Sequence, residues 1–176
     1  MKTNATRKEV FEALKGEFGW TSLMQAPKVT KITVSSGTGT KTDKKRKEFI
    51  KGRLTTLTGQ MPAERAAKKA IATFKSRTGD IVGMQVTLRG ARMQSFLDKL
   101  IHIVFPRIKD FRGFKASSID EMGNLTLGIK EHTVFPEAAD EDAKDIFGLA
   151  VTFTTTAKDK KEAEAFFRFL GMPLQK

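Results

Sequence analysis

The feature that most limits how this chain can fold is a set of short segments in which apolar and small polar residues alternate. The clearest is residues 83–89, where Met84, Val86 and Leu88 alternate with Gln85, Thr87 and Arg89. Similar alternation occurs in residues 29–36, 125–130 and 149–156. Side chains along a strand point to opposite faces in turn, so each segment predicts a strand with one apolar and one polar face. A sheet of such strands must have its apolar face covered by other elements, and its polar face can stay open to solvent.

Between these predicted strands, apolar residues recur at the spacing of a helix. The clearest case is residues 91–105, whose apolar residues recur at helical spacing, and Pro106 is expected to end that helix. Further helices are predicted over residues 6–18, over residues 43–57 and from about Asp159 onward. These helices would cover the apolar side of the sheet. The pattern predicts an α+β fold, in which a mainly antiparallel sheet has helices on one face and an open polar face. We expect one domain over residues 1–176, because no linker or repeat interrupts it.

Two segments are harder to interpret. Residues 62–72 are rich in Ala, Lys and Arg, which favours a helix, but Pro62 and the brevity of the segment permit a short strand. Residues 73–82 contain Lys75, Arg77 and Gly79 and lack a large apolar stripe, so we expect a mobile basic loop. Gly123 and Asn124 predict a tight turn before the strand that follows them.

Charge is distributed unevenly along the chain. The 32 Lys and Arg residues exceed the 20 Asp and Glu residues, giving a net charge of +12. Residues 41–77 hold 12 basic and 3 acidic side chains, whereas residues 120–145 hold 2 basic and 8 acidic ones. The basic block predicts a polyanionic partner, and the acidic block is expected to avoid RNA and to be able to meet a basic protein. Either block could instead be only a solvated surface.

The predicted open face is made mostly of short hydroxyl and amide side chains. Its outward positions are Thr33, Ser35, Gln85, Thr87, Arg89, Thr126, Lys130, Thr152 and Thr154. Short polar groups let a sugar-phosphate backbone come close and can bond phosphates and 2′-hydroxyls. Aromatic residues that would stack single-stranded bases are missing from these positions, so we expect folded RNA to be recognised by shape. Threonine is also common in strands for structural reasons alone, which is the alternative explanation of this face. The nearby Gly37–Gly39 turn, Arg89 and the lysine-rich helix predicted over residues 43–57 (the basic helix) favour RNA binding.

Signals for other chemistry are weak. The chain has no cysteine, which excludes disulfides and thiol catalysis and fits a cytoplasmic protein. Residues 37–42 read Gly-Thr-Gly-Thr-Lys-Thr, but a P-loop needs four residues between its first Gly and the Gly-Lys pair. His102 and His132 have no neighbouring cluster that could hold a metal. We therefore expect no catalytic residue, cofactor, metal, membrane span or small-molecule substrate.

Eight short motifs occur in order along the chain. They are Met24-Gln25-Ala26-Pro27-Lys28-Val29 with Lys31-Ile32; Gly37-x-Gly39; Leu57-Thr58-Gly59-Gln60-x-Pro62; Val86-Thr87-Leu88-Arg89-Gly90; Pro106-Arg107 with Asp110-Phe111-Arg112-Gly113; Gly123-Asn124 with Leu127-Gly128-Ile129-Lys130-Glu131; Phe135-Pro136-Glu137; and Thr155-Thr156-Ala157 with Leu170-Gly171-Met172-Pro173. Each is short, but the ordered set from about Glu17 to Pro173 strongly resembles the bacterial-type family of large-subunit ribosomal protein five.

The resemblance implies a ribosome-associated protein that binds 5S rRNA and attaches it to the large subunit in the central protuberance. It implies further contacts with large-subunit rRNA, the P-site tRNA and neighbouring large-subunit proteins, and an intersubunit bridge with small-subunit ribosomal protein thirteen. Motif matching places 5S rRNA contacts at Ser35, Gln60, Thr87, Arg89 and the Gly37–Gly39 turn. To these the open face adds Gln85, and the basic helix adds Lys44, Lys45 and Lys47.

The resemblance also assigns two other surfaces. The tRNA contact falls on the loop with Lys75, Ser76 and Arg77. The bridge falls on Phe111, Arg112 and Gly113 together with parts of residues 133–146, including Asp140, Glu141 and Asp142. One departure concerns Ser35, where the family usually has Asn, because serine offers fewer hydrogen-bonding groups. The alternative function is an extra-ribosomal RNA chaperone or general RNA-binding protein.

Overall fold

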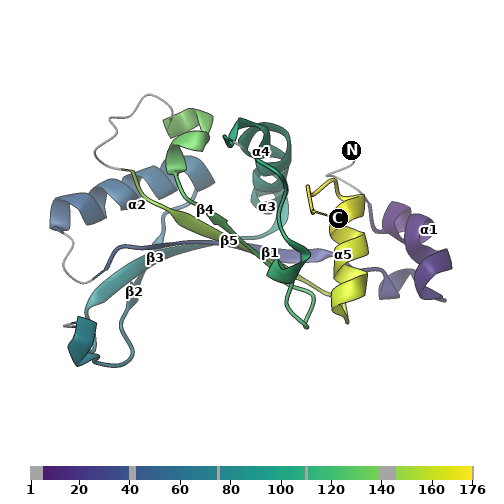
Figure 1. Cartoon of the computed structure of the whole chain (residues 1–176), viewed down its shortest axis with the longest axis horizontal. Helices are drawn as coiled ribbons and strands as arrows, with labels where there is room; N and C mark the ends of the chain where they lie inside the picture. Colours follow the sequence, from purple (N-terminus) through teal and green to yellow (C-terminus); the bar gives the residue numbers. More distant parts are fainter. Residues whose placement is uncertain (1–5, 40–42, 75, 110, 139–145, 176) are drawn as a thin grey trace. The chain divides into compact units, whose positions relative to one another are not determined.

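A computed structural model describes residues 6–39, 43–74, 76–109, 111–138 and 146–175 (Figure 1). Five strands form an antiparallel sheet in the order β2-β3-β1-β5-β4. The strands are β1 (Val29–Gly37), β2 (Ala63–Ala66), β3 (Ile81–Leu88), β4 (Leu125–Ile129) and β5 (Leu149–Thr155). The α-helices in these ranges are α1 (Arg7–Phe18), α2 (Lys44–Thr58), α3 (Gly90–Lys99), α4 (Phe105–Arg107) and α5 (Lys160–Phe169). The predicted α+β class with an antiparallel sheet is confirmed.

The chain divides into two compact units. Unit 1 contains residues 1–32, 89–127 and 152–176, and unit 2 contains residues 33–88 and 128–151. Strands β1, β4 and β5 contribute residues to both units. Within the described ranges, none of the helices combines the length and the apolar character that a membrane span requires.

The core of unit 1 is built from large apolar side chains of its helices and strands. Phe153 of β5 and Phe167 of α5 are fully buried, and their ring centroids lie 6.1 Å apart. Helix α1 contacts α5 and ends at Gly19, whose φ of 63° is a left-handed conformation that glycine adopts without strain. Trp20 then packs against the ring of Phe18, with 5.5 Å between centroids. The apolar stripe of α5 is therefore buried, whereas in the stripe of α1 only Val10 is buried and Phe11, Leu14 and Phe18 are half-buried.

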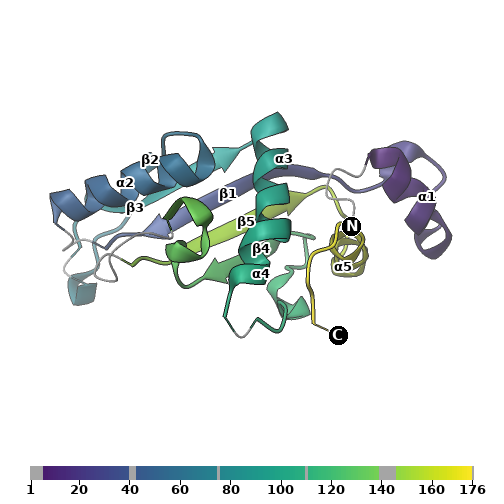
Figure 2. The ribbon, with the colours of Figure 1, turned by 90° about the horizontal axis from the view of Figure 1, so that it is seen from above.

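Helix α2 covers the apolar side of β3 in unit 2 (Figures 1 and 2). Its inward residues Ile50, Leu54 and Leu57 are buried, as are the alternating positions of β3 that face it. The aromatic ring of Phe147 stacks on His132 at 4.1 Å and meets Phe49 edge-on at 6.5 Å. The unit is thus closed on its helix side, and burial on the strands alternates as the sequence predicted.

The helix predicted over residues 91–105 contains a widened segment. Residues Leu100–Val104 form a π-helical turn, and the backbone N–H of Phe105 bonds to the carbonyl of Leu100. The expectation that Pro106 ends the helix is wrong, because the helix continues to Arg107. Proline has no backbone N–H to donate and its ring crowds the preceding turn. A π-turn placed just before it accommodates that ring without breaking the helix.

Residues 62–72 and the following segment form a hairpin. Of the two readings left open for 62–72, the strand occurs: β2 is a four-residue strand, all of it exposed, that pairs antiparallel with β3. Strand β3 starts at Ile81, two residues before the predicted strand, so the predicted loop over 73–82 was too long. A 3-10 turn at Ala72–Phe74 forms the tip of this hairpin. Because every residue of β2 is exposed, its sequence lacks the alternation of apolar and polar residues that would identify it as a strand.

A hydrogen-bonded turn at Gly123 and Asn124 precedes β4. The Asn124 backbone N–H donates to Asp120 Oδ1 at 2.7 Å, and the Asn124 amide donates to Asp120 Oδ2 at 3.0 Å. Across the turn, the Thr155 hydroxyl donates to the Gly123 carbonyl at 2.7 Å. Slight burial raises the pKa of Asp120, but hydrogen bonds from Asn124 and from the Met122 backbone outweigh it, so the pKa is lowered. The charged carboxylate therefore stabilises the turn.

This lowered pKa predicts a pH-dependent contribution to stability. The contribution is complete above the unfolded pKa of about 3.9 and is lost as the pH falls through the lower folded value. We expect the stability difference between the wild type and Asp120→Asn to be constant at neutral pH and to shrink below about pH 4. Urea denaturation of both proteins across this range measures it. A difference that stays constant down to about pH 3 would contradict the assignment.

Candidate nucleic-acid interface

The open face of unit 2 consists of small polar residues and glycines. Ser35 on β1 and Gln85 and Thr87 on β3 are half-buried and alternate with buried apolar positions. Gly83 lies beside Gly37, since a Cβ on Gly83 would stand 3.8 Å from the Gly37 Cα. Because side chains alternate along a strand, Ser35 and Gln85 lie on the same face as this glycine pair. The structure therefore brings together the three predicted contact residues of these two strands.

Arg65 of β2 holds Gln85 in place. Its Nε donates to Gln85 Oε1 at 2.6 Å, and Arg65 pairs with Gly83 in the antiparallel register, one step diagonally from Gln85. Arg65 is exposed, so it adds a cation to the polar face. The sequence did not assign this residue to the site, because residues 62–72 could be either a helix or a short strand. Only its pairing with β3 assigns Arg65 to a face.

Gln60 has a structural contact in addition to its predicted role. Its Nε2 donates to the Thr87 carbonyl at 3.3 Å, where β3 nears its end. The preceding Gly59 has a φ of 68°, and the Thr58 hydroxyl donates to the Gln60 carbonyl at 3.0 Å. These bonds fix the chain after α2, so Gln60 positions the strand end that carries Thr87. Whether its side chain also touches RNA stays a prediction.

The glycine turn after β1 is close to the start of β3. The backbone N–H groups of Thr38 and Gly39 donate to the Val82 carbonyl at 3.0 and 3.1 Å. Gly39 has a φ of 72°, which favours glycine, whereas Gly37 has an ordinary strand conformation and open space where a Cβ would be. The backbone is consequently accessible at Gly37, as the prediction of a close RNA approach requires.

The basic helix α2 lies on the apolar side of this part of the sheet. Lys47 donates to the Ile81 carbonyl at 3.0 Å, Lys51 pairs with Glu64 at 3.1 Å, and the Arg53 guanidinium lies 5.2 Å from the Phe49 ring. Lys44 and Lys45 are exposed. The densest positive charge of unit 2 and its polar face thus lie on opposite sides of the sheet. Lys47 in particular is occupied by a carbonyl, so Lys44 and Lys45 are the better candidates for phosphate contact.

Arg89 follows β3 directly and occupies the N-cap position of α3. Its backbone is extended, with a φ of −141°, and the next residue, Gly90, has a φ of 60°. The side chain is exposed and makes no capping bond to the helix. This arrangement leaves the guanidinium available to an external anion.

The loop predicted to meet the small subunit is packed against the C-terminal segment within unit 1. The ring of Phe111 stacks on Phe105 with 5.9 Å between centroids, and Arg112 is exposed. Gly113 has a φ of 91°, and a Cβ there would stand 2.9 Å from the Pro173 carbonyl oxygen. The predicted bridge residues Asp140, Glu141 and Asp142 lie outside the described residues, as does Lys75 of the predicted tRNA loop.

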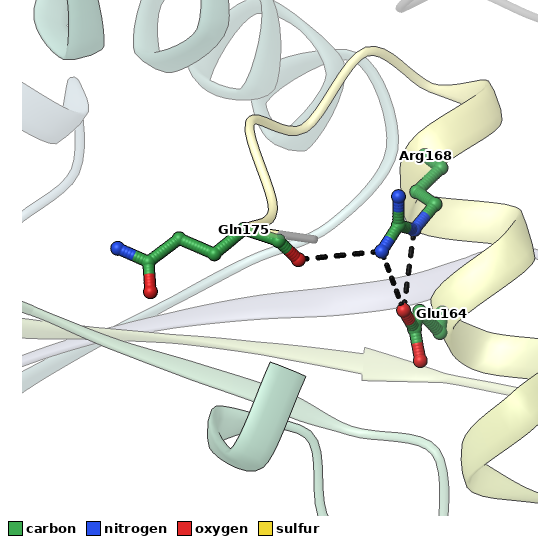
Figure 3. Close-up of polar contacts among 3 residues, drawn as sticks. All are labelled: Glu164, Arg168 and Gln175. Atoms are coloured by element: carbon green, nitrogen blue, oxygen red, sulfur yellow. Dashed lines mark hydrogen bonds and ion pairs between the residues drawn. The ribbon is translucent and has the colours of Figure 1, made fainter. Parts of the chain in front are cut away.

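The C-terminal segment is in turn fastened to α5 (Figure 3). The Arg168 guanidinium donates to Glu164 Oε1 at 2.7 Å and to the Gln175 carbonyl at 3.3 Å. The Gln175 amide donates to the Gly113 carbonyl at 3.1 Å. The loop at 111–113 therefore has a defined backbone supported by a helix, which suits a protein contact surface.

Catalytic and metal-binding arrangements were not expected from the sequence. Within the described ranges, no group of three or more His, Cys, Asp or Glu side chains could hold a metal ion. What these ranges do provide is hydrogen-bonding and cationic surface.

Comparison with known proteins gives two matches to family models that together cover most of the chain. Residues 22–77 match the model described as "Ribosomal protein L5", and residues 81–174 match the model of the C-terminus of the same ribosomal protein family. The large ribosomal subunit protein uL5 of Ureaplasma urealyticum is 46% identical over 171 residues, which are 97% of this chain and 93% of that protein. The uL5 protein of Microcystis aeruginosa is 47% identical over 92% of this chain and 91% of its own length. The uL5 protein of a Thermoanaerobacter species is 44% identical over 96% of this chain and 95% of its own length.

Proposed function

The chain belongs to the ribosomal protein L5 family, a structural and non-enzymatic component of the large ribosomal subunit, and on this basis we propose that it binds 5S rRNA through the open face of its sheet. It attaches the 5S rRNA to the large subunit in the central protuberance. Residues 1–176 act together as one RNA-binding domain, supported by a sheet whose strands β1, β4 and β5 contribute to both units.

The polar face of unit 2 is the observation that carries this proposal. Ser35 on β1 and Gln85 and Thr87 on β3 project from neighbouring strands, and Arg65 adds a cation at the edge strand. Short side chains allow a ribose-phosphate backbone to approach the sheet, and their hydroxyl and amide groups match 2′-hydroxyls and phosphate oxygens. The face therefore suits folded RNA recognised by its shape.

Other contacts of the proposed function fall on separate surfaces. Lys44 and Lys45 would attract phosphates of 5S or large-subunit rRNA. The hairpin residues Lys75, Ser76 and Arg77 would meet the P-site tRNA. The loop Phe111–Gly113, with Asp140, Glu141 and Asp142, would form the bridge to small-subunit ribosomal protein thirteen, and exposed remaining surface would meet neighbouring large-subunit proteins.

An RNA chaperone outside the ribosome is the second candidate, favoured by the net charge of +12 and by a polar face suited to shape rather than base sequence. Sedimentation of the protein with large subunits through a high-salt sucrose cushion separates the two. We expect the chain to stay with the subunit, because many contacts hold it there. Release of the chain into the supernatant would favour the chaperone.

Arg89→Ala is expected to weaken 5S rRNA binding by about 1–3 kcal/mol, which is typical for loss of a charge-assisted contact to RNA. The side chain is exposed and makes no capping bond, so the fold should be unaffected. Filter binding measures the affinity, and circular dichroism checks the fold. An unchanged affinity would remove Arg89 from the interface.

A further inference from the structure

The tip of the β2–β3 hairpin exposes apolar side chains that the rest of the fold does not use. Phe74 is 70% exposed and Ile71 is 47% exposed. Exposing a phenylalanine ring to water forgoes about 2 kcal/mol of the stabilisation that burial would give. Within the described part of the chain, the Phe74 ring stacks on no other aromatic ring. The fold therefore gives no reason for an aromatic residue at this position.

Backbone hydrogen bonds give the hairpin tip a defined conformation. Ile71 and Ser76 exchange both backbone bonds at 3.2 Å, which closes the 3-10 turn Ala72–Phe74 between them. Below them, the Ala67 backbone N–H donates to the Asp80 carbonyl at 2.8 Å, and Asp80 Oδ2 accepts from the Arg77 backbone N–H at 2.8 Å. An ordered tip lowers the entropy lost when a partner binds. Phe74 is thus presented outward on a preformed support.

The hairpin that carries Phe74 is also rich in exposed cationic side chains. Lys68, Lys69 and Arg77 of the same hairpin are all exposed, and residues 65–77 contain no acidic side chain. Aromatic rings interleaved with Lys and Arg are characteristic of surfaces that stack nucleobases while holding the phosphates nearby. An apolar protein partner would not need this excess of positive charge, so the charge favours RNA.

We propose that the ring of Phe74 stacks on an exposed nucleobase of the tRNA, and that Arg77 and the hairpin lysines hold the neighbouring phosphates. This inference rests on the proposed function, because it refines the contact between the hairpin and the P-site tRNA. It differs from the contact at the sheet face, where stacking groups are absent and shape is recognised. The two surfaces would therefore bind RNA by different physical means.

The test uses large subunits reconstituted with variant proteins and measures the affinity of deacylated tRNA for the P site. We expect Phe74→Ala and Phe74→Leu each to weaken binding on the order of tenfold, since one base–aromatic stack is lost. Phe74→Trp should retain wild-type affinity, because a larger aromatic ring still stacks. Met61→Ala is the matched control: Met61 is 66% exposed in the same unit, and its loss should change affinity less than about twofold.

The variants distinguish a failure of the stacking proposal from a failure of the proposed tRNA contact. If Arg77→Ala weakens tRNA binding while Phe74→Ala does not, the hairpin contacts tRNA by charge alone and the stacking proposal is wrong. Full affinity with Phe74→Leu would also overturn it, because an aliphatic side chain cannot stack in the same way. If both Arg77→Ala and Phe74→Ala bind normally, the proposed tRNA contact itself fails. Thermal unfolding of each free variant should match the wild type, because these side chains are exposed.

Discussion

Thr87→Glu is expected to weaken 5S rRNA binding about a hundredfold, because a like charge placed against phosphates costs about 3 kcal/mol. Thr87 is half-buried on the open face of β3, where a longer acidic side chain would also hold the RNA away from the sheet. The contact that Gln60 makes here uses the Thr87 carbonyl, so it survives the substitution. The variant should therefore fold normally and bind poorly, which filter binding and circular dichroism together measure.

The matched control for this variant is Thr56→Glu. Thr56 is exposed on α2, whose inward residues pack on the apolar side of β3. The substitution changes the net charge of the protein by the same amount, so long-range repulsion of RNA is alike in both variants. We expect Thr56→Glu to lose less than about fivefold, through long-range charge alone. Equal losses in the two variants would mean that the sheet face is not the contact surface.

Gly123→Ala is expected to lower the free energy of unfolding by about 2–4 kcal/mol, from backbone strain and overpacking together. Gly123 has a φ of 74°, and a Cβ there would stand 2.8 Å from the Ala157 Cβ and 3.2 Å from its carbonyl oxygen. Neither atom is the far end of a flexible side chain, so the turn itself must shift. The shift would also strain the bond from the Thr155 hydroxyl to the Gly123 carbonyl. Urea denaturation measures the loss.

Gly16→Ala makes the same chemical change as Gly123→Ala, but it is expected to raise the free energy of unfolding. Gly16 lies on the exposed side of α1, has an ordinary helical conformation, and has open space where a Cβ would be. Alanine in a helix is favoured over glycine by about 0.5–1 kcal/mol, so stability should rise. If the two alanine variants are equally stable, the close approach at Gly123 is not a constraint on the fold.

The polar face of the sheet was predictable because its residues follow a strict period of two. Only one orientation of β3 buries the apolar Met84 and Val86 and leaves the polar Gln85 and Thr87 outside. The sequence alone therefore assigns both faces of this strand. The same reasoning placed Ser35 outward on β1. The ordered motifs then added the family, which periodicity alone does not contain.

Contacts between segments distant in sequence were not predictable in this way. Arg65 reaches Gln85 only because the short, fully exposed β2 pairs with β3, and no local pattern indicates that pairing. The sequence alone predicts Lys47 as one more cation of the basic helix, but its position over the start of β3 lets it donate to the Ile81 carbonyl. The helix through Pro106 depends on a widened turn whose hydrogen bonds no sequence rule specified. Each case depends on tertiary geometry rather than local propensity.

The proposed function requires this protein to bind 5S rRNA specifically and not merely to attract polyanions. Filter binding of the wild type to 5S rRNA, to tRNA and to a random RNA duplex across a salt series tests it most directly. Charge attraction alone weakens steeply and equally with salt for every RNA, whereas a fitted interface keeps its preference. We predict that 5S rRNA remains the tightest ligand throughout the series, and that its advantage grows as salt is raised. Equal affinity for all three RNAs would contradict the claim.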